Sequence, residues 1–220
     1  MLIAVKKRFV FVANSKTAST SIDKALMAEC EIYRGGSAKN KHIFLRQAIK
    51  EYDFLFGRPK YAPSTFFKFG IIREPLSWVQ SWYRYRLGNG SIDAGMTFQA
   101  FWEEKAGPAA RSGKRMKQSN FFTKHNGELL IDYLIPYEDL AAQFEKIGSQ
   151  LGIQTSLPHK NKSAVEKIAD PLSDELVADI RTTLATDFDL YDRVESINKQ
   201  GWEHLLSTRP TAKEAVSESA

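Results

Sequence analysis

The feature that most constrains this chain is a short apolar segment followed by a polar loop and a helical pattern. Residues 8–26 read RFVFVANSKTASTSIDKAL. The apolar, β-favouring residues 9–13 predict a buried strand, and residues 22–29 predict a helix. The backbone N–H groups of such a loop and of the helix start point at one place, where the helix dipole adds positive potential. The segment therefore predicts a site for an anion.

The side chains of this loop have the chemistry that an anion site needs. Lys16 carries a positive charge. Hydroxyl groups that can donate hydrogen bonds to phosphate or sulfate oxygens follow it at Thr17, Ser19, Thr20 and Ser21. The loop is not a Walker A motif, because no glycine occurs in residues 1–34. A Ser- and Thr-rich helix cap with a solvent-facing lysine explains the same residues, and this segment alone does not separate the two interpretations.

The rest of the chain predicts strands that alternate with helices. Residues 65–73 and 129–137 predict further strands, and helical patterns follow them at 74–86 and 138–151. More helices are expected at 42–52 and 174–184, with 187–194 continuing the latter. Residues 87–117 predict a long irregular loop with one short helical piece at 98–105. This alternation predicts an α/β fold in three layers, a central parallel sheet flanked by helices.

A second group of anion-binding residues follows the strand at 65–73. Arg73 ends that strand, and Ser81 lies eight residues later in the expected helix. Ligands of parallel sheets bind at the carboxyl ends of the strands, so Arg73 and the first loop are expected at the same edge. A guanidinium group can hold a phosphate by two parallel hydrogen bonds. Taken singly, a surface or salt-bridged arginine and a neutral helical serine explain the same two residues.

Composition and charge limit the alternatives. The 220 residues predict one domain, residues 1–207, and a polar C-terminal tail, 208–220, that is expected to be disordered. No apolar run approaches the ~20 residues of a membrane span, and the N-terminus does not resemble a signal peptide, so a cytoplasmic location is expected. The net charge of +5 is spread along the chain, which argues against a nucleic-acid partner. One cysteine and four scattered histidines predict no metal site.

These motifs, taken in order, resemble a known family. Residues 15–21 resemble the 5′-phosphosulfate loop of sulfotransferases that use 3′-phosphoadenosine 5′-phosphosulfate (PAPS), most closely the Lys-Thr-Ala-Ser-Thr-Ser form of heparan sulfate 2-O-type carbohydrate sulfotransferases and their bacterial relatives. Arg73 and Ser81 resemble that family's 3′-phosphate motif. The blocks at 66–75, 137–140, 157–163 and 187–191 resemble further family blocks in the same order. The chain departs from the commonest pattern at Ser15, Ser19 and Trp78, where members have proline, glycine and a second arginine.

The resemblance implies a fold like that of P-loop nucleoside kinases and a role for each motif. PAPS would be the sulfuryl donor, and no metal would be needed. The 5′-phosphosulfate would be held by Ser15, Lys16, Thr17, Ala18, Ser19, Thr20 and Ser21, and the 3′-phosphate by Arg73 and Ser81. Lys16 would stabilise the developing charge during transfer, and the acceptor would be a hydroxyl of a carbohydrate or glycolipid.

A base is needed for the proton of the acceptor, and His42 is the candidate. It is expected at the start of the helix 42–52, and its ordinary pKa suits proton removal near neutral pH. A histidine that caps or packs at a helix start explains it equally well. Two other functions also stay open: a non-catalytic module that binds the nucleotide, and a P-loop-type phosphotransferase. The sequence does not indicate the oligomeric state.

Overall fold

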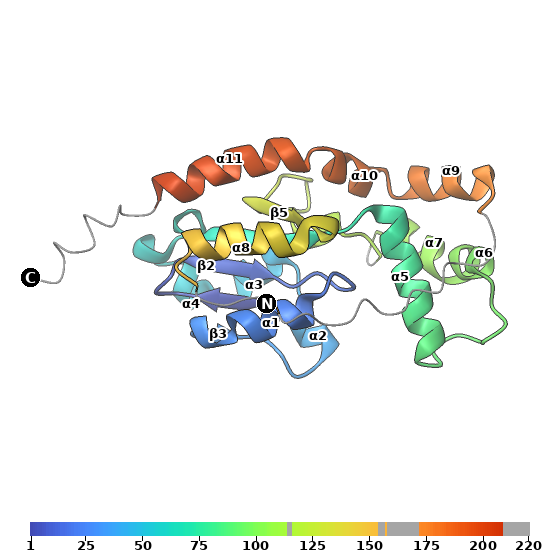
Figure 1. Ribbon diagram of the computed structural model, residues 1–220, viewed down its shortest axis with the longest axis horizontal. Helices are drawn as coiled ribbons and strands as arrows, with labels where there is room; N and C mark the ends of the chain where they lie inside the picture. The colour runs from blue at the N-terminus through green and yellow to red at the C-terminus, as the bar shows by residue number, and fades with distance from the viewer. Residues whose placement is uncertain (114–115, 154–156, 158–171, 209–220) are drawn as a thin grey trace, which may run out of the picture.

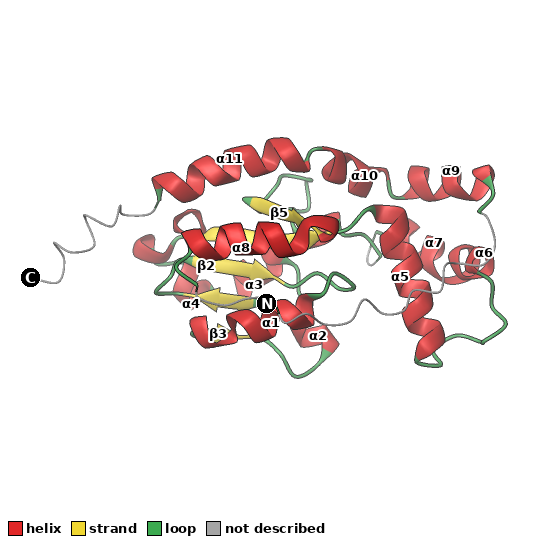
Figure 2. Cartoon of the chain, in the orientation of Figure 1, coloured by secondary structure: helices red, strands yellow, loops and turns green. Residues whose placement is uncertain are grey.

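The computed structural model describes residues 1–113, 116–153, 157 and 172–208 as an α/β fold. A five-stranded mixed sheet is flanked by helices (Figures 1 and 2). The strand order is β3-β1-β2-β4-β5. The bounds are Leu2–Ala4 for β1, Phe9–Val12 for β2, Ile32–Tyr33 for β3, Phe67–Ile72 for β4 and Tyr133–Pro136 for β5.

The expected all-parallel sheet is corrected to a mixed one. The three strands predicted from the sequence are present, and β4 pairs in parallel with both β2 and β5. The strand β1, in contrast, pairs antiparallel with β2 and with β3. A tight turn joins β1 to β2, and Arg8 closes it with a φ of 51°. Strands as short as β1 and β3 leave too few residues for an apolar period to be recognised.

The helices begin and end close to the predicted positions where the sequence has strong signals. Glu74 caps α5 by accepting hydrogen bonds from the N–H groups of Leu76 and Ser77, and Gly152, with a φ of 61°, follows the end of α8. The helices are α1 Ser19–Leu26, α2 Ala38–Lys41, α3 Leu45–Glu51, α4 Asp53–Phe56, α5 Pro75–Gly88, α6 Phe98–Phe101, α7 Gly107–Arg111, α8 Leu140–Gln150, α9 Asp174–Thr183, α10 Ala185–Asp192 and α11 Val194–Ser207.

Both faces of the sheet are covered. On one face Phe9, Phe11 and Phe69 pack against α1 and α8. On the other face Val10 and Val12 pack against α3 and α4 and against the start of α11. Burial on both faces explains why β2 is apolar at every position and why β4 is apolar except at Lys68, whose ammonium group pairs with Asp132.

The expected helical piece at 98–105 is confirmed by α6 and by a turn of π-helix at Trp102–Ala106. The expectation of irregular structure after it was wrong for residues 107–111, which form α7. Phe101 and Trp102 are fully buried in a cluster with Trp78 of α5 and Ile180 of α9. The many glycines and basic residues of the segment 87–117 favour a loop, and no local pattern indicates that its aromatic residues are buried.

The helix α11 covers the outer edge of β5, where backbone groups would otherwise be exposed. Asn198 accepts a hydrogen bond from the N–H of Leu134 and donates one to its carbonyl oxygen, both at 2.8 Å. Gly201 lets the helix approach closely, because a Cβ there would lie 1.7 Å from the carbonyl oxygen of Asp132. Within the part of the chain that is described, no helix has the length and apolarity needed to cross a membrane. The expected tail lies outside the described residues beyond Thr208, as does most of the block at 157–163.

Candidate anion-binding site

The loop between β2 and α1 has an unusual backbone for its sequence. Lys16 and Ala18 adopt the left-handed conformation, with φ of 61° and 56°. Such a conformation costs roughly 1–3 kcal/mol for a residue other than glycine and is concentrated at functional sites. Ala18 is the N-cap of α1 and offers no side-chain cap, so no cap side chain accepts from the first N–H groups of the helix. This geometry is typical of a loop that presents N–H groups to an anion.

The loop is held by contacts that leave Lys16 outside the core. The Thr17 hydroxyl, expected to face the ligand, is buried and donates to the carbonyl oxygen of Asn14 at 3.0 Å. The indole N–H of Trp78 donates to the carbonyl oxygen of Ser15 at 2.8 Å. Trp78 therefore supports the loop through this hydrogen bond. The Thr20 hydroxyl accepts a hydrogen bond from Lys41 Nζ at 3.1 Å.

Two predicted cations, Lys16 and Arg73, meet at this edge of the sheet. The Lys16 ammonium group lies 3.9 Å from the ring centre of Tyr85, and the Arg73 guanidinium lies 4.5 Å from that of Tyr137. Arg73 Nε donates to the hydroxyl of Ser77 at 2.9 Å. The structure thus pairs Arg73 with Ser77, whereas Ser81 lies one helical turn further along α5.

A third cation, Arg84, belongs to the same group. The pKa of Lys16 is lowered by burial and then by repulsion from Arg73 and Arg84, and the pKa of Arg84 is lowered by burial and by Arg73. No acidic group counters either shift, and among the described residues none of the three cations takes part in an ion pair. The site therefore concentrates uncompensated positive charge at the carboxyl ends of β2 and β4, as an anion site does.

No protein-family model, curated protein or solved structure matches this chain. The resemblance to sulfotransferases therefore rests on the sequence motifs alone.

Sequence reasoning missed Ser77 and Arg84 because neither belongs to a motif that it used. A helical signal was available. Ser77, Ser81 and Arg84 follow one another at spacings of four and three residues, so they share one face of α5. Since Arg73 precedes this helix and bonds to Ser77, that face borders the site.

The structure places His42 differently from the prediction. His42 is the C-cap of the short helix α2 and does not begin a helix; α3 begins at Leu45. Its pKa is lowered chiefly by burial, and not by a helix N-terminus. Its Nδ1 lies 2.7 Å from the carbonyl oxygen of Ala13, the residue between β2 and the loop. Because a carbonyl oxygen only accepts, Nδ1 carries the hydrogen, and Nε2 of the neutral ring has a free lone pair.

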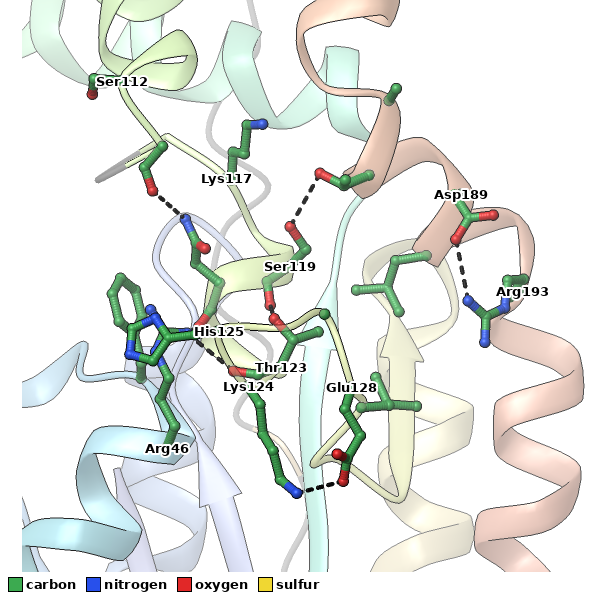
Figure 3. Close-up of a pocket in the computed structure, with 18 residues that line it drawn as sticks. Arg46, Ser112, Lys117, Ser119, Thr123, Lys124, His125, Glu128, Asp189 and Arg193 are labelled. Atoms are coloured by element: carbon green, nitrogen blue, oxygen red, sulfur yellow. Dashed lines mark hydrogen bonds and ion pairs between the residues drawn. The ribbon is translucent and has the colours of Figure 1, made fainter.

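The structure also contains a cavity of about 1080 Å³. Figure 3 shows its lining, which comes from the start of α3, residues 112–113, residues 117–129, the helix α10 and Arg193, which follows that helix. Ion pairs join Lys124 to Glu128 at 2.5 Å and Arg193 to Asp189 at 3.2 Å on its walls. None of the residues from 14 to 21, nor His42, Arg73 or Ser81, lines it. The cavity therefore does not include the candidate anion site.

Proposed function

We propose that this protein is a sulfotransferase that moves a sulfuryl group from PAPS to a hydroxyl of a carbohydrate or glycolipid. The observation that carries the proposal is the uncompensated group of Lys16, Arg73 and Arg84 beside a loop with two left-handed residues. A donor with a phosphosulfate and a separate phosphate has two anionic ends, and this edge of the sheet offers a cation for each. The proposal includes a core like that of P-loop nucleoside kinases, made by β2, β4 and β5, to which β1 and β3 add an antiparallel extension.

In the proposed reaction His42 Nε2 accepts the proton of the acceptor hydroxyl. The acceptor oxygen forms a bond to sulfur while the bond from sulfur to the leaving phosphate oxygen breaks, and the electron pair of that bond remains on the phosphate. Lys16 and the loop N–H groups stabilise the charge that develops there, as positioned donors do in phosphoryl transfer. The resulting adenosine 3′,5′-bisphosphate would keep its 3′-phosphate against Arg73.

Two other functions fit the site less well. A P-loop phosphotransferase would require carboxylates free to hold Mg²⁺ near the loop. Of the carboxylates next to the loop, Asp23 pairs with Lys41 at 2.8 Å and Glu74 caps α5. A non-catalytic module would bind the nucleotide through the same cations, and turnover that depends on an acceptor distinguishes it from the enzyme.

Calorimetric titration with adenosine 3′,5′-bisphosphate, 5′-AMP and ATP tests the donor. We expect selective binding of the bisphosphate, because only it places a phosphate at the 3′ position opposite Arg73. Binding no tighter than that of 5′-AMP would overturn the sulfotransferase proposal. Tighter binding of ATP, dependent on Mg²⁺, would favour a phosphotransferase instead.

The His42→Ala variant tests the base. We expect it to bind adenosine 3′,5′-bisphosphate like the wild type and to turn over roughly 10²-fold more slowly, the usual contribution of a general base. The exposed His125 provides the matched control, His125→Ala, which should retain the wild-type rate. An unchanged rate in His42→Ala would mean that another group takes the proton.

A further inference from the structure

A buried glutamine joins the two halves of the anion site. Gln118 is fully buried, and its side-chain Oε1 accepts hydrogen bonds from Asn14 Nδ2 at 2.9 Å and from the backbone N–H of Arg73 at 3.1 Å. Its Nε2 donates to the carbonyl oxygen of Arg73 at 2.7 Å. The regular pairing of β2 with β4 ends at Val12 and Gly70, so the amide of Gln118 bridges the two chains just where their ladder has stopped.

The two partners of Gln118 each hold one part of the proposed anion site, the Lys16 loop or Arg73. On one side, Asn14 accepts the Thr17 hydroxyl through its own carbonyl oxygen and so anchors the loop that carries Lys16. On the other side, both backbone polar groups of Arg73 are bonded to the same amide. The position of the Arg73 guanidinium relative to the loop therefore depends on one side chain.

Gln118 is itself held by a buried carboxylate. Asp187, also fully buried, accepts hydrogen bonds from the backbone N–H groups of Gln118 at 2.6 Å and of Ser119 at 2.9 Å. These two bonds connect α10, far along the chain, to the segment between Lys117 and Ser119. Loss of one partner would leave a buried polar group without compensation.

We propose that Gln118 is a positioning residue, which fixes the separation between the Lys16 loop and Arg73, and that Asp187 fixes Gln118. The identity of the ligand in this inference rests on the proposed function, but the bridge itself does not. Neither residue would touch the ligand. Gln118 would act by holding Arg73 in place, because a displacement of about 1 Å between two groups that bind one ligand can cost on the order of 10²-fold in rate.

The test compares Gln118→Met with the wild type. Methionine has a similar length, but it can neither donate to the Arg73 carbonyl oxygen nor accept from Asn14. We expect the affinities for adenosine 3′,5′-bisphosphate and for inorganic pyrophosphate to fall about 10-fold or more, while the exposed control Gln99→Met leaves both unchanged. If Gln118→Met fails to fold, Gln118→Asn, which keeps the amide on a shorter chain, is expected to show the same loss to a lesser degree.

The decisive measurement repeats Gln118→Met in an Arg73→Ala background. Because Gln118 is proposed to act through Arg73, the glutamine substitution should then cause no further loss of affinity. A folded Gln118→Met protein with wild-type affinities, or a loss that persists in full without Arg73, would overturn the inference. A wild-type protein with no preference for the bisphosphate over 5′-AMP would overturn the proposed function. If the pyrophosphate affinities still change as expected, the role of Gln118 would stand.

Discussion

Replacing Lys16 with alanine is expected to reduce sulfuryl transfer by about 10³-fold or more and to leave the fold intact. The loss of one donor that stabilises developing charge typically costs 10²- to 10³-fold, and Lys16 supplies a full charge. The backbone of the variant should be unaffected, because alanine already adopts the same left-handed conformation two residues later, at Ala18. Turnover with PAPS and an acceptor, measured beside thermal unfolding, separates the two effects.

The thermal midpoint of Lys16→Ala gives this prediction a second readout. The lysine is repelled by Arg73 and Arg84 and forms no ion pair within the described residues, so its removal relieves a like-charge contact. The cation–π contact with Tyr85, which is lost at the same time, lies at an exposed ring and is worth about 0.5–1 kcal/mol. We therefore expect a midpoint at or slightly above that of the wild type. The exposed Lys24 of α1 supplies the control, Lys24→Ala, and wild-type turnover in Lys16→Ala would remove this lysine from the mechanism.

The sequence predicted the parts of the fold in which local pattern and tertiary environment agree. The strands β2, β4 and β5 are largely apolar because both faces of the sheet are covered, and Pro75 and Gly152 stand where the helices α5 and α8 begin and end. The strands β1 and β3 were not predicted, because they are too short to show an alternation of apolar residues. Their pairing depends instead on the turn at Arg8 and on contacts between distant residues.

The candidate anion site was likewise predicted only in part. Lys16 and Arg73 were predicted because each follows a recognisable strand, and topology brings the carboxyl ends of parallel neighbours together. Gln118 and Asp187 could not be predicted, because their roles depend on a segment folded by Phe101 and Trp102, whose burial no local pattern reveals. The position of His42 was misjudged because the predicted helix 42–52 begins three residues before α3, and α2 is a single turn of polar residues with no apolar pattern.

Arg73→Ala is expected to weaken binding of adenosine 3′,5′-bisphosphate roughly 100-fold, about 2.7 kcal/mol, and to change binding of 5′-AMP much less. The difference between the two ligands is the 3′-phosphate, so a selective loss identifies the group that Arg73 holds. Arg73→Lys should not restore the affinity, because an ammonium group cannot reproduce the planar pair of N–H donors. Calorimetric titration of the two variants beside the exposed control Arg58→Ala measures this directly.

The size of the affinity loss in Arg73→Ala also depends on Arg84. It lies on the face of α5 that borders the site, and it perturbs the pKa of Lys16 together with Arg73. If it shares the 3′-phosphate, Arg84→Ala alone should weaken the bisphosphate less than Arg73→Ala does, and the double variant should bind it no better than 5′-AMP. Equal losses for the bisphosphate and 5′-AMP in Arg73→Ala would instead place the guanidinium at the 5′ end of the nucleotide, beside Lys16, and would leave the 3′-phosphate to other residues of α5.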